Sequence, residues 1–170
     1  NVTATLTDAS GIPTTGTLMP RIYYNKNGGA FVSDPGVLNT GNANNGNWTF
    51  TMTFANVGGI TTGDVIGYYL IAQDIAGTPN LGSTPSGVVA TDVNTVTTAP
   101  TASTYTVVST LSSNTYAVGV GGDFATLTDA VTAYNNSCLD GPVIFSLTDL
   151  LYNESVTILN NADASAVNSL

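Results

Sequence analysis

The acidic side chains best placed for chemistry in this sequence are aspartates that lie beside turn-forming residues. Loop carboxylates and carbonyl oxygens are the ligands that calcium prefers. The sequence contains no D-x-D-x-D-G pattern, and aspartates beside turns commonly accept hydrogen bonds from their own turn. We therefore expect capping and turn roles and no cofactor, with calcium as the alternative. These residues are Asp8, Asp34, Asp64, Asp74 and Asp92.

Two pairs of neighbouring tyrosines, Tyr23-Tyr24 and Tyr68-Tyr69, are the candidates for ligand binding. Together with Trp48 they could form an aromatic platform for the rings of a polysaccharide. Neighbouring residues in a strand face opposite ways, so one tyrosine of each pair, and Trp48, are expected in the core. The identity of any ligand stays open.

The remaining groups that could take part in catalysis have local structural explanations. Asp123 and Asp129 flank a predicted helix start, where negative charge is favoured. Glu154 precedes a predicted strand and is expected to accept main-chain hydrogen bonds in a turn. Cys138 is the only cysteine, so no internal disulfide forms, and we expect it to be a buried small apolar residue. We accordingly expect no catalytic residue and no metal ligand in this chain.

Composition excludes several classes of function. The chain has 170 residues, 2 Lys+Arg, 11 Asp+Glu and no His, for a formal net charge of −9. A nucleic-acid partner requires a basic surface, and a membrane span requires about 20 consecutive apolar residues. Scarce lysine with abundant Thr, Asn and Gly is typical of exported bacterial surface proteins. We therefore expect a secreted or cell-surface (extracellular) protein, seen here as a mature or trimmed segment.

Alternating apolar and polar residues in segment 1–108 predict antiparallel strands with one face in water. The alternation is strict in Val2–Thr7 and Trp48–Phe54, and further strands are expected at Arg21–Tyr24, Asp64–Gln73 and Thr104–Val108. The almost entirely apolar run within Asp64–Gln73 is expected to lie centrally. Turn-forming residues, among them Asp34-Pro35-Gly36, separate the strands, and this spacing favours a β-sandwich.

The stretches PRIYY (20–24), WTF (48–50) and YYLIAQDIAG (68–77) resemble immunoglobulin-like modules of large secreted proteins of Bacteroidota. The resemblance covers residues 1–108. It implies an immunoglobulin-like β-sandwich that serves as a spacer or binding unit without catalytic residues, and it suggests export by type IX secretion.

A different pattern follows residues 109–114, which we expect to be a linker. Leu127, Ala130, Val131 and Tyr134 share one helical face, and Thr126 with Asp129 resembles a capping box. Strands are expected at Val143–Leu147 and Ser155–Leu159.

In residues 115–170 the stretches GDFATLTDAVTA (122–133) and PVIFSLTDLLYNESVTI (142–158) resemble the start of a right-handed parallel β-helix, as in pectin methylesterases and pectate lyase-like proteins. The resemblance implies an N-terminal capping helix followed by the first coil. The catalytic Asp and Arg residues of those families lie on later coils, so no catalytic residue carries over.

The sequence thus predicts a mostly β protein: an immunoglobulin-like β-sandwich, then a capping α-helix and the first coil of a parallel β-helix. The predicted function is a non-catalytic structural or adhesive segment, acting as a spacer or presenting scaffold. Its expected partners are downstream domains of the same polypeptide or neighbouring chains. The alternative is an accessory carbohydrate-binding module of a polysaccharide esterase or lyase whose active site lies on later coils.

Overall fold

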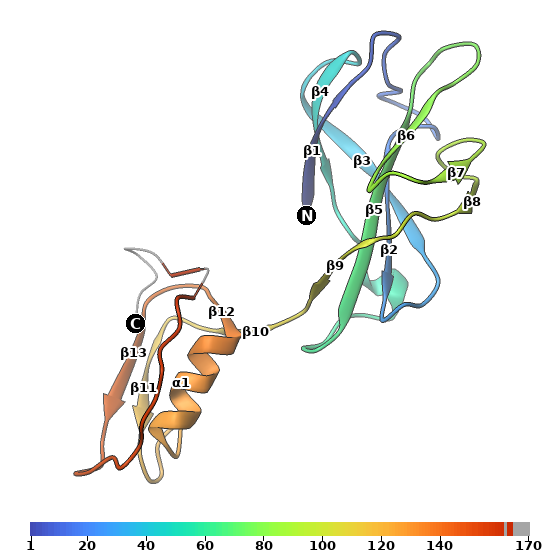
Figure 1. Ribbon diagram of the computed structural model, residues 1–170. Coiled ribbons are helices and arrows are strands. Elements are labelled where there is room, and N and C mark those ends of the chain that lie inside the picture. Colours follow the sequence, from blue (N-terminus) through green and yellow to red (C-terminus); the bar gives the residue numbers. More distant parts are fainter. Residues whose placement is uncertain (162, 165–170) are drawn as a thin grey trace. The chain divides into compact units, whose positions relative to one another are not determined.

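The computed structural model describes residues 1–161, 163 and 164, and it is mostly β with one α-helix in this part of the chain (Figure 1). The chain divides into two compact units, Asn1–Val107 and Val108–Leu170. The described residues contain no helix that is both long and apolar enough to cross a membrane.

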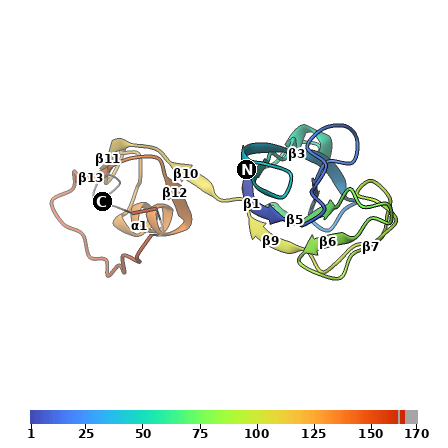
Figure 2. The ribbon, with the colours of Figure 1, turned by 90° about the horizontal axis from the view of Figure 1, so that it is seen from above.

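The first unit is built on a seven-stranded antiparallel sheet that curls on itself (Figures 1 and 2). The strand order is β1-β4-β3-β2-β5-β6, and β9 pairs with β5 beside β6. A 3-10 helix, η1 (Phe54–Val57), and a small β7–β8 hairpin (Val89–Ala90 and Val96–Thr98) complete the unit. The sheet strands are β1 (Val2–Thr7), β2 (Arg21–Lys26), β3 (Val32–Gly41), β4 (Asn45–Phe50), β5 (Val65–Gln73), β6 (Leu81–Thr84) and β9 (Ser103–Thr106).

Strand β5 is central, as its apolar composition predicts. It pairs with β2 along one edge and with β6 and β9 along the other. Ile66 and Leu70 belong to the main core, whereas Tyr69 and Ile71 are buried outside that cluster. Because both faces of β5 are covered, a continuous apolar run is stable there. The buried members of the main core are Ile12, Ile22, Tyr24, Trp48, Phe50, Met52, Ile66 and Leu70.

The prediction of a turn at Asp34-Pro35-Gly36 is wrong, because these residues lie inside β3. At this point β3 changes partners: Pro35 is opposite Arg21 of β2, and Gly36 is opposite Phe50 of β4. A Cβ atom on Gly36 would lie 2.5 Å from the Phe50 ring. Residues that usually form a turn therefore let the strand pass from one partner to the next.

The predicted strand over Trp48–Phe54 ends early, at Phe50, and Phe54 begins the 3-10 helix. The main-chain N–H of Thr53 donates to the carboxylate of Asp34 at 2.7 Å and to the hydroxyl oxygen of Tyr24 at 3.0 Å. Hydrogen bonds from the Thr53 main chain to side chains of β2 and β3 thus replace the main-chain hydrogen bonds to a neighbouring strand that the alternation predicts.

The second unit contains two pairs of parallel strands and one helix. Strand β10 (Ser109–Leu111) pairs with β12 (Ser137–Leu139), and β11 (Asn114–Val118) pairs with β13 (Val143–Leu147). Helix α1 (Leu127–Asn136) lies between the two halves in sequence. A short strand, a corner and a longer strand therefore occur twice, and the second copy pairs with the first in parallel.

The helix and its capping are confirmed. The side chain of Thr126 accepts a hydrogen bond from the N–H of Asp129, and Ala130, Val131 and Tyr134 are buried. The strand Val143–Leu147 is confirmed as well.

Two predictions in this half of the chain are wrong. Residues 109–114, expected as a linker, supply β10 and the first residue of β11. Ser155–Leu159 is not a strand. There the amide side chain of Asn135 on α1 donates to the carbonyl of Thr157 and accepts from the N–H of Leu159, so a helix side chain takes the place of a partner strand.

Candidate functional site

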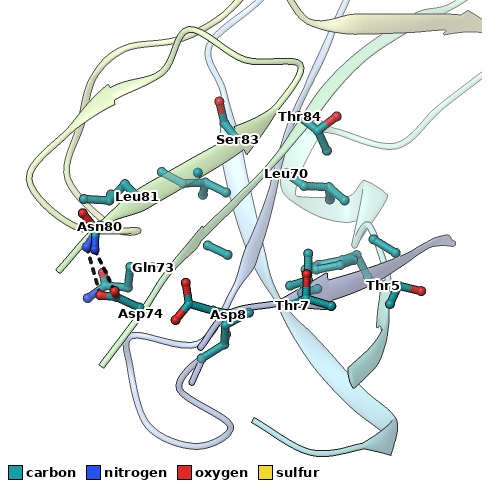
Figure 3. Close-up of a pocket in the computed structure, with 17 residues that line it drawn as sticks. Thr5, Thr7, Asp8, Leu70, Gln73, Asp74, Asn80, Leu81, Ser83 and Thr84 are labelled. Carbon is teal, nitrogen blue, oxygen red and sulfur yellow. Dashed lines mark hydrogen bonds between the residues drawn. The ribbon is translucent and has the colours of Figure 1, made fainter. Parts of the chain in front are cut away.

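A groove of about 500 Å³ runs along the first unit between β1 on one side and β5 with β6 on the other (Figure 3). These are the two ends of the sheet, since the strand order begins at β1 and finishes at β6. The groove is lined by residues 4–8, 70–74 and 80–84, together with Ile12 and Phe50. Sequence reasoning missed this site, because no local pattern shows which strands will be left at the ends of a sheet.

The groove-facing edge of β1 carries main-chain groups that do not bond to β4. The N–H of Asp8 donates to the carbonyl of Asn44 on the β4 side. Hydrogen bonding alternates along an antiparallel pair, so Val2, Ala4 and Leu6 also bond toward β4. The N–H and C=O groups of the threonines between them, residues 3, 5 and 7, therefore point to the other edge of β1, which pairs with no strand in the described part of the chain.

Apolar side chains form the inner surface of the groove. Ala4 and Leu6 of β1 are half-buried and pack against the main core, whose Phe50 and Leu70 also line the groove. These β1 side chains are more accessible than core residues of a completed sheet would be.

One end of the groove is acidic. Asp8 and Asp74 lie near Gln73 at this end, whereas Thr5, Leu70 and Thr84 lie toward the other (Figure 3). Hydrogen bonds from the side chain and main chain of Asn80 lower the pKa of Asp74 below its ordinary value. Asp74 therefore carries its negative charge at neutral pH.

The four candidate tyrosines do not form one platform, and none of them lines the groove. Tyr24 and Tyr69 are fully buried, whereas Tyr23 and Tyr68 are half-buried. Tyr23 stacks on Tyr69 with ring centroids 5.1 Å apart, and burial raises the pKa of Tyr69 to about 12. Tyr68 instead contacts Tyr105 edge-on at 6.2 Å. Trp48 is also buried, with 1% of its surface exposed.

The turn aspartates accept hydrogen bonds within the fold. Asp8 bonds to the N–H groups of Ser10 and Gly11, Asp64 to Thr61 and Asn27, and Asp92 to Asn94 and Thr95. Among the residues that the structure describes, no three His, Cys, Asp or Glu side chains form a group that could hold a metal ion.

Asp34 has a different role from the other turn aspartates, because it joins β2 and β3 to the segment that follows β4. Its carboxylate accepts from the Tyr24 hydroxyl at 2.7 Å and from the Thr53 N–H. Burial opposes ionisation, but the hydrogen bonds from Tyr24 and Thr53 lower the pKa of Asp34 overall. This partly buried, charged contact holds the segment after β4 against β2 and β3.

Glu154 caps α1 from 26 or more residues away in the chain. Its carboxylate accepts from the N–H groups of Leu127 and Thr128, at 3.0 and 2.7 Å, and from the Thr128 hydroxyl. These groups lie in the first turn of the helix, where N–H groups have no partner within the helix. Asp123, by contrast, accepts from the N–H of Ala117 and does not cap the helix.

The pKa of Glu154 predicts how the second unit responds to acid. Hydrogen bonds from the Thr128 hydroxyl and N–H, and from the Leu127 N–H, lower this pKa below its ordinary value of 4.5. A lowered folded-state pKa gives stability that is complete above about pH 4.5 and is lost as the pH falls through the folded-state value. We expect the melting temperature of the second unit to drop below pH 4.5.

The measurement is thermal unfolding between pH 7 and pH 3, followed by a dye on the single cysteine. Glu154→Gln should lower the melting temperature at pH 7 and flatten its dependence on pH. An Asp149→Asn variant, whose carboxylate accepts from the N–H of Val120 and not from α1, controls for other carboxylates of this unit. An unchanged acid dependence in Glu154→Gln would contradict the capping role.

A second groove, also of about 500 Å³, lies in the second unit and is lined by apolar residues. It is bounded by α1, β13 and the segment after Glu154. Ile144, Leu147 and Ile158 each expose more than half of their side chains, at 56, 52 and 54%. The lining residues are Leu127, Val131, Ile144, Phe145, Leu147, Val156 and Ile158.

Cys138 is exposed, so the prediction of a buried cysteine is wrong. It lies in β12 between Ser137 and Leu139, which are buried. The alternation of the strand therefore turns the thiol outward. Local desolvation and the carboxylate of Asp163 raise the pKa of Cys138, so the thiolate is disfavoured at neutral pH.

Comparison of the chain with protein-family models, with curated proteins and with solved structures found no match.

Proposed function

We propose that this chain is a non-catalytic structural segment of a large secreted or cell-surface bacterial protein. In this proposal the first unit is an immunoglobulin-like module that acts as a spacer. The second unit is the N-terminal cap and opening coil of a parallel β-helix, onto which further coils stack. The sequence resemblances to Bacteroidota modules and to pectin methylesterase-like solenoids support this assignment, including an extracellular location reached by type IX secretion.

The observation that carries the proposal is the parallel pairing of the second unit. Ser109 pairs with Ser137, 28 residues later, and Asn114 pairs with Val143. The chain therefore returns above its own path after 28 or 29 residues, as in a coil of a solenoid. Apolar residues stack on apolar residues along this ladder, for example Leu111 on Leu139.

In this proposal the apolar groove of the second unit is the surface against which the next coil packs. A solenoid leaves the end of its apolar column uncovered unless another coil or a cap lies on it. Val131, Phe145 and Leu147 line the apolar groove of this unit. The expected neighbour is a downstream coil of the same polypeptide or of a neighbouring chain.

The test is to fuse one, two or three coils after Leu170, each repeating the apolar ladder of β12 and β13. We expect the melting temperature of the second unit, reported by a dye at Cys138, to rise with every coil, because stability in repeat proteins adds through neighbouring interfaces. Matched coils with aspartate at the ladder positions are the control. If both series leave the melting temperature unchanged, the stacking role is wrong.

Polysaccharide binding is the second candidate, and the pair Tyr68 and Tyr105 favours it because both rings are partly exposed. Electrophoresis of the full chain through gels containing pectin or xylan tests it. Retardation that is lost in Tyr105→Ala, but kept in the Tyr116→Ala control of the second unit, would support a glycan-binding module. Equal mobility with and without polysaccharide would exclude it for these glycans.

A further inference from the structure

We propose that the groove between β1 and β6 receives an extended segment of another polypeptide, which adds as a strand along the free edge of β1. This segment carries alternating apolar side chains, and a Lys or Arg near its N-terminus. The inference concerns the first unit alone and is independent of coil stacking in the second.

The main chain of β1 provides the binding edge. The outward N–H and C=O groups belong to Thr3, Thr5 and Thr7, because the intervening residues bond toward β4. From Thr3 to Thr7 this edge spans about 13 Å, the length of about four residues of an added strand. Main-chain hydrogen bonds of this kind give strand addition its affinity with little dependence on sequence.

Apolar contacts with the groove lining would stabilise the added strand. Side chains of the new strand that face inward would lie beside Ala4 and Leu6 and opposite Leu70 and Leu81, which line the groove. Covering the half-buried side chains of β1 removes apolar surface from water, at about 25 cal/mol per Å². The volume of about 500 Å³ accommodates several such side chains.

Charge favours a foreign, basic segment over a second copy of this chain. Asp8 and Asp74 lie at one end of the groove (Figure 3). The chain has only two basic side chains: Arg21 bonds to Ser33, and Lys26 bonds to the carbonyl of Gly59. A second copy would also bring a net charge of −9.

The added strand is taken as antiparallel to β1, because antiparallel pairing is the more stable per residue. Asp8 directly follows the C-terminal end of β1. A segment antiparallel to β1 places its N-terminal residue there, so its basic residue belongs at the N-terminus.

A sugar is a poorer occupant of the groove than a peptide, because the one aromatic lining residue, Phe50, is fully buried and offers no ring face for stacking.

The test measures binding of a fluorescent peptide, acetyl-KTVTIT-amide, to the full chain by fluorescence anisotropy. The decisive variant is Thr5→Pro, which removes an outward N–H. Proline is tolerated on a sheet edge when its N–H side faces away from the neighbouring strand. We expect about a tenfold or greater loss of affinity. Thr5→Ala keeps that N–H and should bind within about twofold of the wild type.

A second comparison tests the charge and the location. The peptide acetyl-ETVTIT-amide should bind at least about tenfold more weakly. Leu147→Asp, in the apolar groove of the second unit, should leave the affinity unchanged. Circular dichroism on Thr5→Pro verifies that the sheet is intact, and if this variant unfolds, amide NMR shifts of the wild type on peptide addition locate the binding edge.

Three results would overturn the proposal. One is the absence of binding by either peptide. Another is binding that is insensitive to Thr5→Pro, or NMR shifts that lie away from β1. The third is a dimer of the free chain that Thr5→Pro abolishes, which would make a second copy the occupant.

Discussion

Replacing Trp48 by alanine is expected to cost the first unit about 3–5 kcal/mol of unfolding free energy, because a fully buried large aromatic side chain is removed from the core. Trp48 lies in β4, opposite Ala4 of β1 and Leu38 of β3. A Cβ on Gly46 would lie 2.4 Å from Leu38 and 3.2 Å from the indole nitrogen, so the neighbouring side chains already fill this space. The surrounding core therefore has little freedom to collapse into the cavity.

Hydrogen exchange measured by mass spectrometry would check this prediction, since it reads the stability of the two units separately. Protection should fall throughout β1–β5 and stay unchanged in β10–β13. Trp48→Phe is the matched variant: it keeps most of the ring and removes the Nε1–H, which is buried without a hydrogen-bond partner among the described residues. Trp48→Phe should lose less unfolding free energy than Trp48→Ala, because it leaves a smaller cavity in the core. An equal loss of unfolding free energy in both variants would contradict the packing argument.

Replacing Gly141 by alanine is expected to destabilise the second unit by about 1–3 kcal/mol through overpacking. Gly141 lies in the corner between β12 and β13, directly above the corner between β10 and β11. A Cβ at this position would lie 2.6 Å from the Cβ and 2.9 Å from the Oγ of Ser113. Ser113 also donates to the carbonyl of Pro142 and, through its N–H, to Asp140. The two corners therefore have no room to move apart without breaking these bonds.

A double-mutant cycle with Ser113→Gly isolates this contact. Ser113→Gly alone should cost a modest amount through loss of the hydroxyl hydrogen bond. In the double variant the steric cost of Gly141→Ala should largely vanish, so that the two changes are strongly non-additive. Urea unfolding followed by a dye at Cys138 provides the measurement. Simple additivity of the two changes would show that the corners are not in contact.

Local patterns predicted some of the individual elements but not β3, β6–β8 or β10–β12. The alternation of Val2–Thr7 produced β1, and the apolar spacing with Thr126 at the helix start produced α1. The apolar run of β5 correctly indicated a central strand. These successes share a cause: side-chain periodicity and capping depend on residues only a few positions apart.

Two of the wrong predictions arose where a distant group replaced the local partner. The predicted strand ends after Phe50, where the carboxylate of Asp34 accepts from the N–H of Thr53. In Ser155–Leu159 the side chain of Asn135 hydrogen-bonds to the main chain in place of a partner strand. The tyrosine candidates show the same limit, because alternation predicted one buried member in each pair but not that Tyr23 would stack on Tyr69.

By itself, the sequence determined the mostly β character of the chain, the capped helix at Leu127–Asn136 and its acidic, cation-poor surface, because composition and short-range periodicity control these properties. Only the tertiary structure decided that β1 and β6 end the sheet on either side of one groove, that β3 changes partners at Gly36, and that Glu154 caps α1. Each of these features depends on how segments tens of residues apart meet, and many different pairings satisfy the same local pattern.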